Sequence, residues 1–383
     1  MLKLAWVITL LVIISGSVGG YYFWQKSSDK SSSPDSSQTQ EKDANDNSAK
    51  IKFDKVKTIT VDGASLWLFA IVDDKNQVIL STEGNGGIKL AKFDLNNPNN
   101  KPEWKTVINS SDIEGKRVAD HWHEFYNDYH WIVFSISEAN TGYLLKLDRE
   151  LNRIKLAKVA DKTILKEGEV PMINSMNPYL PTNDMFLVPE DKGVTAGFYL
   201  PGTGHKLFRL DSDLNLLENI NIGGGDYTHG NGSSAKKVEN GYDLIAVDQM
   251  NMLQQGAVNL IKFDADWNPI KKISLVDIDK TNIGMASGVY TDNGTLIVNA
   301  RVYESAYPKG ELPPPADPNA PLAQDGAKIK RFTFDSNYKL LSTEEIYNQT
   351  DGNRPHTSII DDKLITAWDA GGKAYLRIDK ISY

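Results

Sequence analysis

The stretch Phe263-Asp264-Ala265-Asp266-Trp267-Asn268-Pro269-Ile270 decides the fold, because variants of it recur along the chain. Each copy follows a short apolar run that contains a basic residue, and most copies precede a second alternating run. Asp and Asn tolerate turn geometry and hydrogen-bond to their own backbone, so each copy predicts a strand, a polar turn and a returning strand. The conserved position of the repeat is an Asp at Asp94, Asp148, Asp211, Asp264, Asp335 and Asp379.

These copies lie between 44 and 71 residues apart. A repeat at roughly this spacing is typical of a propeller or a similar array of β-sheets. No long stretch has the periodicity of an amphipathic helix, which favours an all-β fold. The pattern divides the chain into six units at residues 65–109, 118–159, 172–222, 227–276, 284–346 and 355–383.

The two ends of the repeated region complement each other. The last unit has room for three strands only, whereas residues 53–61 form a spare strand before the first unit. Pairing them closes the ring and removes two exposed sheet edges, which are otherwise an aggregation hazard. We therefore predict a closed six-bladed β-propeller over residues 51–383, in preference to an open β-sandwich or two domains. The Pro-rich stretch 304–327 is expected to be an inserted loop, because proline removes backbone donors.

Composition excludes several classes of protein. The 383 residues include 42 basic and 50 acidic side chains, for a net charge of −8, and 40% are hydrophobic, which is ordinary for a globular chain. Most of the basic residues are Lys, so the basic, Arg-rich face of a nucleic-acid-binding protein is not expected. The absence of Cys rules out disulfides, thiolate metal sites and thiol nucleophiles.

The N-terminus resembles an export segment followed by a spacer. Residues 4–24 are predominantly apolar, end in Tyr21-Tyr22-Phe23-Trp24, and are long enough to span a bilayer. We predict that residues 1–26 form a signal anchor in a single-pass membrane protein, with the propeller outside the cytoplasm. The alternative is a secretion signal cleaved after Ser17-Val18-Gly19. Residues 27–50 are almost devoid of apolar side chains and are predicted to be a disordered linker.

Histidine recurs at one place in the repeat, at the start of a unit's first strand. First strands line the central channel of a propeller, so these side chains are expected to converge at the channel mouth, where convergent polar groups suggest a binding site. Histidine also suits proton transfer near neutral pH, although a wet channel needs polar lining in any case. The recurring position holds Trp67, His123, Asn177, His229, Ser287 and His356, and His121 lies close by.

Metal binding by this set is not predicted. Three neutral imidazoles can hold zinc, but His123, His229 and His356 belong to alternate units and would meet only across a narrow channel. Asp211-Ser212-Asp213 and Asp264-Ala265-Asp266 lack the Gly and terminal Glu of a calcium loop and are interpreted as turns. No cofactor follows from the sequence.

A six-unit propeller with His on its channel-lining strands resembles the arylsulfotransferase family. The similarity lies in Asp120-His121-Trp122-His123-Glu124, in His229 and in Arg354-Pro355-His356, although Trp122 interrupts the adjacent His pair of that family. The resemblance implies an exported propeller that transfers a sulfuryl group through a channel His. It further implies that His123 or His356 is the nucleophile or acid–base, and that Arg354 binds the anionic group.

Two functions remain open from the sequence. The first is a ligand- or partner-binding module, in which Trp67, His121, Asn177 and Ser287 contribute to recognition at the channel mouth. The second is a transferase, lyase or hydrolase that uses His123, His229, His356 and Arg354 in catalysis. A propeller fold alone supports either, since many unrelated functions share it.

Overall fold

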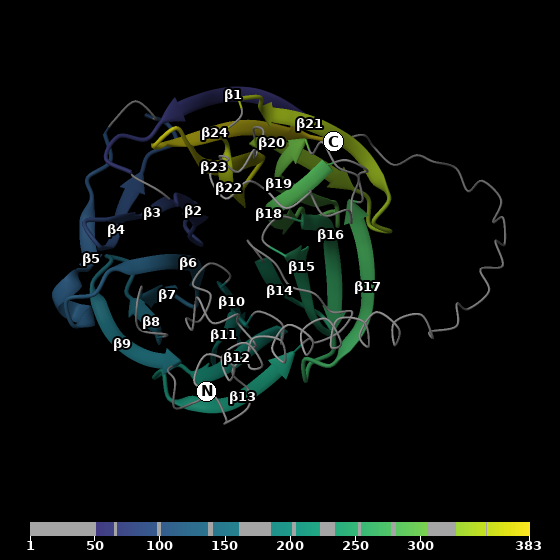
Figure 1. Ribbon diagram of the computed structural model, residues 1–383. Coiled ribbons are helices and arrows are strands. Elements are labelled where there is room, and N and C mark those ends of the chain that lie inside the picture. Colours follow the sequence, from purple (N-terminus) through teal and green to yellow (C-terminus); the bar gives the residue numbers. More distant parts are fainter. Residues whose placement is uncertain are drawn as a thin grey trace, which may run out of the picture. The chain divides into compact units, whose positions relative to one another are not determined.

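A computed structural model describes the chain over residues 51–64, 67–97, 101–136, 141–160, 185–200, 204–222, 234–251, 254–276, 281–304, 327–349 and 351–383. These residues form six four-stranded antiparallel sheets, which we number as blades one to six (Figure 1). The only helical segment within them is a single 3₁₀ turn, Ser110–Ile113. The all-β prediction is therefore confirmed.

Blades one to five each consist of four consecutive strands. Those of blades one and two are β2 (Phe69–Val72), β3 (Val78–Gly84), β4 (Gly87–Phe93), β5 (Lys105–Ile108), β6 (Val118–Tyr126), β7 (Tyr129–Ile136), β8 (Thr141–Leu147) and β9 (Arg153–Ala160). Those of blades three and four are β10 (Met185–Glu190), β11 (Gly193–Leu200), β12 (Gly204–Asp211), β13 (Leu216–Ile222), β14 (Ser234–Val238), β15 (Gly241–Asn251), β16 (Gln254–Phe263) and β17 (Pro269–Val276). Blade five contains β18 (Thr281–Tyr290), β19 (Leu296–Glu304), β20 (Ala327–Phe334) and β21 (Leu340–Tyr347).

Blade six is built from both ends of the propeller. Its first three strands are β22 (Asn353–Ile360), β23 (Lys363–Ala370) and β24 (Lys373–Ser382), and its outer strand is β1 (Lys52–Thr60). The β1–β24 register runs from Lys52 opposite Ser382 to Thr60 opposite Tyr375, with one bulge. The predicted closure by the N-terminal strand is confirmed, and it gives the last sheet its fourth strand.

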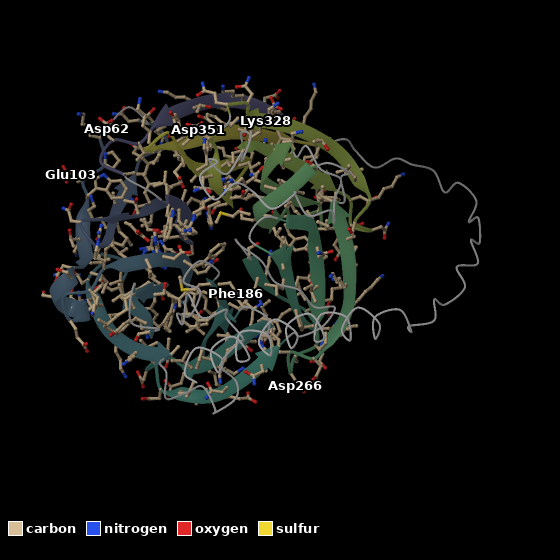
Figure 2. All side chains as sticks on the ribbon, viewed as in Figure 1. Asp62, Glu103, Phe186, Asp266, Lys328 and Asp351 are labelled. Atoms are coloured by element: carbon tan, nitrogen blue, oxygen red, sulfur yellow. The ribbon has the colours of Figure 1, made fainter. Side chains whose placement is uncertain are left out.

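The first strands of the blades contact one another in order around the ring. β2 contacts β6, β6 contacts β10, and the series continues through β14 and β18 to β22, which returns to β2. The innermost strands therefore surround a common axis, as the ribbon shows (Figure 1). Phe186 on the inner strand β10 lies toward the interior, whereas Asp266 lies in an outer turn (Figure 2).

The repeated Asp forms a turn that also anchors the core. Asp264 Oδ1 accepts hydrogen bonds from the backbone N–H groups of Asp266 (2.9 Å) and Asn268 (2.8 Å). Trp267 takes a left-handed conformation (φ 63°), is 1% exposed, and stacks on Tyr242 at 3.9 Å. An apolar residue with positive φ occupies the same place in the turns that begin at Asp148, Asp211 and Asp335, namely Leu151, Leu214 and Tyr338.

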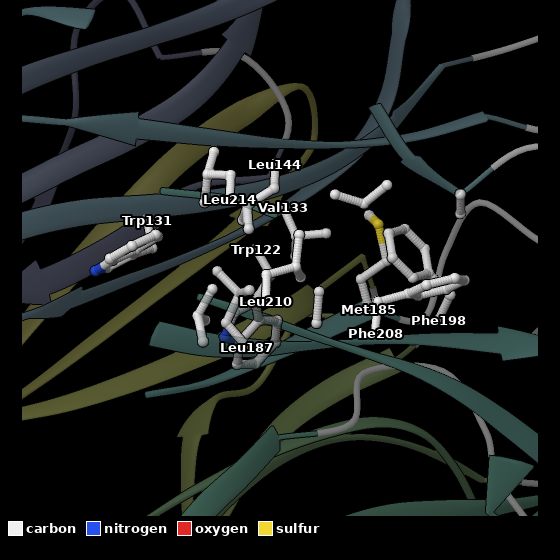
Figure 3. Close-up of a cluster of buried hydrophobic side chains, with 14 of the residues drawn as sticks. Trp122, Trp131, Val133, Leu144, Met185, Leu187, Phe198, Phe208, Leu210 and Leu214 are labelled. Carbon is white, nitrogen blue, oxygen red and sulfur yellow. The ribbon is translucent and has the colours of Figure 1, made fainter. Parts of the chain in front are cut away.

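Hydrophobic side chains fill the spaces between neighbouring blades. One cluster joins Trp131, Val133 and Leu144 of blade two to residues of blade three, with Leu214 from an Asp turn among them (Figure 3). The partners in blade three include Met185, Leu187, Phe198, Phe208 and Leu210. Because each blade packs its faces against both neighbours, the inner strands are held in fixed register at the axis.

Several predictions concern residues outside the described part of the chain. The signal anchor (1–26), the linker (27–50) and nearly all of the Pro-rich stretch (304–327) fall there. Within the described residues, no helix has the length and hydropathy needed to cross a membrane.

Candidate functional site

Five inner strands meet around one pocket at the propeller axis. The pocket is small and partly open to solvent. Its residues come from β2, β6, β10, β18 and β22, and therefore from five of the six blades. The lining consists of Phe69, Asp120, His121, Trp122, Met185, Met285, Ala286, Arg354 and Pro355. The pocket thus combines an apolar wall with charged groups.

Aromatic contacts fix the apolar wall. The ring of Phe69 meets the rings of His121 at 4.7 Å, Trp122 at 5.2 Å and His356 at 4.8 Å, each edge to face. Trp122 Nε1–H also donates to Glu124 Oε1 at 2.9 Å, which sets the orientation of the indole. Edge-to-face aromatic groups of this kind resist displacement, so the wall is preformed.

Arg354 is the cation of the pocket, and it already has protein partners. Its Nη1 donates to Asp120 Oδ1 at 2.9 Å, and its guanidinium lies 3.2 Å from the centre of the Trp67 ring. Both Trp67 (φ 63°) and Arg354 (φ 44°) have positive φ, which is strained for residues other than Gly. Such strain persists only where surrounding contacts enforce it, and it concentrates at functional sites.

Three buried carboxylates surround this arginine. Burial raises the pKa of Glu83 to about 8 and that of Asp120 to about 7, and it also raises the pKa of Asp369. Arg354 opposes these shifts at all three groups. Arg117 acts on Glu83 in the same direction, and Arg301 acts likewise on Asp369. Asp120 already occupies Nη1 of Arg354, so an additional anion competes with this carboxylate for the guanidinium.

His121 connects the pocket to the space between blades one and two. Its Nε2 lies 3.2 Å from Ser81 Oγ, and its Nδ1 lies 4.0 Å from Glu83 Oε1. Burial, reinforced by Arg354, lowers the pKa of His121 to about 3, so the imidazole is neutral. It therefore presents one donor and one acceptor nitrogen to its surroundings.

The other predicted His and Ser residues lie deeper than the pocket lining. His123 Nε2 is 3.0 Å from His130 Nδ1, and His356 packs against Phe69 and Trp122. Burial lowers the pKa of both His123 and His356, which keeps them neutral. Ser287 Oγ donates to Thr357 Oγ1 at 3.3 Å. These three residues support neighbouring strands and do not line the pocket.

Asn177 and His229 lie outside the described residues. The described inner strands of their blades run from Met185 and from Ser234, so the placement of Asn177 and His229 stays a prediction. Trp67 directly precedes β2, and there it contacts Arg354. Of the eight predicted site residues, the structure brings Trp67, His121 and Arg354 together at the pocket.

Sequence reasoning missed Phe69, Glu83 and Asp369. Glu83 and Asp369 belong to second strands, β3 and β23, which the search for channel-lining first strands did not include. Asp120 was noted in the sequence only as part of the motif Asp120-His121-Trp122-His123-Glu124. The sequence did contain a signal for these two acids, because each is the next-to-last residue of its strand: Glu83 precedes Gly84, and Asp369 precedes Ala370.

Comparison with known proteins gives only distant similarities. No family model and no curated protein match the chain, so the resemblance to arylsulfotransferases rests on short motifs alone. Among solved structures, the N10 neuraminidase-like protein of influenza A/little yellow-shouldered bat/Guatemala/060/2010 is 8% identical over 86% of this chain and 99% of that one, with a TM-score of 0.47. A DUF4221-family protein from Bacteroides vulgatus is 9% identical over 87% of this chain and 99% of its own, with a TM-score of 0.44.

A third solved structure is a lectin. SapL1, in complex with α-methyl fucoside, is 13% identical over 82% of this chain and 90% of its own, with a TM-score of 0.44. At such identities and TM-scores the similarity says nothing about activity. The six sheets and their closure by β1 define the chain as a six-bladed β-propeller, a fold compatible with ligand binding.

Proposed function

We propose that this protein is a ligand-binding propeller that captures a small molecule in the channel-mouth pocket. The observation that carries the proposal is the pocket itself, in which Phe69, Trp122 and Met285 form an apolar wall beside Asp120 and Arg354. Binding pockets typically combine such a wall with a few fixed polar groups. The strained backbone at Trp67 and Arg354 further indicates that the charged edge is held in place before a ligand arrives.

The ligand we propose has an apolar body and a cationic or hydrogen-bond-donating group. Asp120 already pairs with Arg354 at 2.9 Å, so an anion has to displace this carboxylate, whereas a positive or hydrogen-bond-donating group can bind to it. This pairing argues against anion binding by Arg354. The positions of His123 and His356 behind the pocket lining likewise favour binding over sulfuryl transfer.

A thermal-shift assay tests the proposal with the full-length chain. The probes are four cations with apolar bodies, namely choline, tyramine, tryptamine and spermidine, with p-nitrophenyl sulfate as the anionic comparison. At a concentration 100 times its Kd, a ligand stabilises the folded protein by about 2.7 kcal/mol. We expect at least one cation to raise Tm, and we expect p-nitrophenyl sulfate to leave it unchanged.

Pocket variants identify where the probe binds. Asp120→Asn and Met285→Ala should abolish the shift, because they remove a charge and part of the apolar wall. Asp292→Asn, in the exposed β18–β19 turn, makes the same chemical change elsewhere and should preserve the shift. Stabilisation by the anion alone, a shift that survives both pocket variants, or no shift with any cation would refute the proposal.

We further propose that the propeller is tethered to a membrane on its extracytoplasmic side by residues 1–26. The support is the apolar stretch 4–24 and its terminal aromatic cluster. In cells, the full chain should sediment with membranes, resist carbonate extraction and be accessible to protease from outside the cytoplasm. Recovery of a shortened chain in the medium would instead identify a cleaved secretion signal.

A further inference from the structure

We propose that Glu83, Asp120 and His121 bind a divalent transition-metal ion, for which Zn²⁺ is the reference case. One carboxylate oxygen from each acid and one imidazole nitrogen all lie within 4.8 Å of one another. Glu83 is near the end of β3, and Asp120 and His121 are near the start of β6. The three side chains therefore meet where blades one and two join beside the pocket.

The imidazole of His121 provides the strongest argument. Its side chain is 0% exposed, and within the described part of the chain Nδ1 has no hydrogen-bond partner. The nearest carboxylate oxygen, Glu83 Oε1, is 4.0 Å away, which is too far for a hydrogen bond. A buried nitrogen without a partner is costly, and no described donor or acceptor lies within hydrogen-bond distance of it. A cation between this nitrogen and the two carboxylates satisfies all of them.

Ser81 holds His121 in the tautomer that a metal requires. Ser81 Oγ lies 3.2 Å from Nε2 and is fully buried. When Nε2–H donates to this hydroxyl, Nδ1 carries the lone pair and faces Glu83. Metal-binding histidines commonly donate their second ring N–H to a fixed partner in this way, which sets the orientation of the ring.

Asp120 is oriented in a similar manner. Its Oδ1 accepts the backbone N–H of His121 at 2.7 Å and Nη1 of Arg354 at 2.9 Å. Both bonds use Oδ1, which leaves Oδ2 to bind a metal. Glu83 is largely buried, with 18% of its side chain exposed, so it remains within reach of a solvent-borne ion.

The donor set indicates the class of metal. Two carboxylate oxygens and one imidazole nitrogen suit Zn²⁺ and neighbouring transition metals, whereas Ca²⁺ and Mg²⁺ prefer oxygen ligands alone. Bonds to Zn²⁺ are about 2.0–2.2 Å long, which sets tetrahedral donor atoms about 3.4 Å apart, so the three donors must move closer together by up to about 1.4 Å when the ion binds. Three protein ligands leave a fourth position open. Asp120 and His121 also line the pocket, so a bound metal ion competes with the cationic group of the proposed ligand for Asp120. The metal site therefore goes beyond the proposed function and does not depend on it.

Metal binding is tested directly by calorimetry. The full-length chain, without a polyhistidine tag, is stripped with EDTA and titrated with Zn²⁺, Mn²⁺, Ca²⁺ and Mg²⁺ chlorides. We expect one Zn²⁺ per chain and at least about tenfold weaker binding of Ca²⁺ and Mg²⁺. Absence of Zn²⁺ binding, or equal affinity for Zn²⁺ and Ca²⁺, would overturn the proposal, because His121 would then have no role as a ligand.

Variants assign the site. Glu83→Gln and His121→Gln should each weaken Zn²⁺ binding by at least about tenfold, and Ser81→Ala should do so by about 10- to 100-fold. The matched controls are Glu218→Gln, which changes an exposed acid on β13, and His130→Gln, which changes a buried His on β7. Both variants should bind Zn²⁺ with the affinity of the parent. Unchanged affinity in Glu83→Gln and His121→Gln would place the ion elsewhere.

A spectrum of the parent protein keeps the test independent of variant folding. Co²⁺ bound in place of Zn²⁺ should show the intense visible bands of a low-coordinate site. A weak, six-coordinate spectrum would overturn the assignment of a four-coordinate site with one open position. Repeating the thermal-shift assay of the organic cations with and without Zn²⁺ separates ligand binding from metal binding. If a cation raises the Tm of the metal-free chain, the proposed function holds even when no metal binds.

Discussion

Arg331 and Asp379 form an ion pair with 2.7 Å between Nη2 and Oδ2, and neither side chain has any exposed surface. The pair links β20 of blade five to β24 of blade six. Asp379 Oδ1 also accepts Nε of Arg377 at 2.8 Å, and the guanidinium of Arg331 lies 4.6 Å from the ring of Phe53 on the closing strand β1. This network of charges therefore lies at the junction where the ring closes.

We predict that Asp379→Ala destabilises the propeller strongly. The substitution leaves Arg331 and Arg377 with the partly exposed Glu344 as the carboxylate that they still share. Breaking a buried pair typically costs about 3–5 kcal/mol, and Glu344 places the expected loss toward the lower end. Urea unfolding measures the loss. Asp362→Ala removes a half-exposed carboxylate near Lys380 and should cost less than about 1 kcal/mol. Equal effects of the two substitutions would contradict the view that the Arg331–Asp379 pair secures the ring.

The repeated Asp turn provides a second prediction. Asp264→Ala removes the acceptor for the backbone N–H groups of Asp266 and Asn268 and for the Asn268 side-chain amide. Asp264→Asn keeps one side-chain oxygen in place. We therefore expect Tm to decrease in the order parent, Asp264→Asn, Asp264→Ala. Asp292→Ala, an exposed change in another turn, should leave Tm nearly unchanged. If Asp264→Ala has the same Tm as the parent, the stability of the turn would depend on the packing of Trp267 alone.

These turns explain why the fold could be predicted from the sequence. Asp and Asn at fixed offsets from apolar runs reveal local structure, and the unpaired strand 53–61 matched a missing strand at the other end. The role of the apolar turn residue was not foreseen. Trp267 with positive φ contradicts the local preference for Gly or Asn, and only its stacking on Tyr242 accounts for it.

The site was predicted less well, for reasons of register and pairing. The pocket is lined by Asp120 to Trp122 of β6, whereas His123, one residue further along, lies within hydrogen-bond distance of His130. Hydrophobic periodicity does not reveal at what depth a channel opens. Glu83 reaches the site from a second strand, and the contact with His121 depends on the packing of blade one against blade two, which the sequence of neither blade specifies.

The buried His123–His130 pair predicts sensitivity to acid. Burial lowers the pKa of His130 from 6.5 to about 4, with Asp73 opposing the shift and Lys92 and Arg149 adding to it. Between these values the unfolded chain binds a proton that the folded chain does not. The contribution of His130 to stability is therefore fully present above about pH 6.5 and is lost as the pH falls toward about 4.

His130→Gln isolates this contribution, because glutamine does not titrate but can still hydrogen-bond to His123. We expect the difference in unfolding free energy between pH 7 and pH 5 to be smaller in the variant than in the parent. The carboxylates common to both chains cancel in this comparison. An identical pH dependence in the two proteins would show that His130 keeps an ordinary pKa in the fold.

Because the backbone at Trp67 is left-handed, we predict that glycine is more stabilising than alanine at this position, which is the reverse of the usual order. Alanine in place of tryptophan removes the ring that lies on Arg354 but retains the steric penalty of φ 63°. Glycine removes the same ring and also the penalty, which is about 1–2 kcal/mol for an L-residue. Trp67→Gly should thus be more stable than Trp67→Ala by roughly that amount in urea unfolding, although glycine normally destabilises a folded chain relative to alanine.

Trp67→Phe separates the ring from the backbone. Phenylalanine keeps an aromatic face for the guanidinium and the same strain, so it should be closest to the parent in both stability and probe binding. Trp67→Gly, although more stable than Trp67→Ala, should bind the cationic probe as weakly as Trp67→Ala does, because both leave Arg354 and its partner Asp120 without the ring that positions them. If Trp67→Gly bound the probe as the parent does, the strained tryptophan would serve the fold and not the pocket.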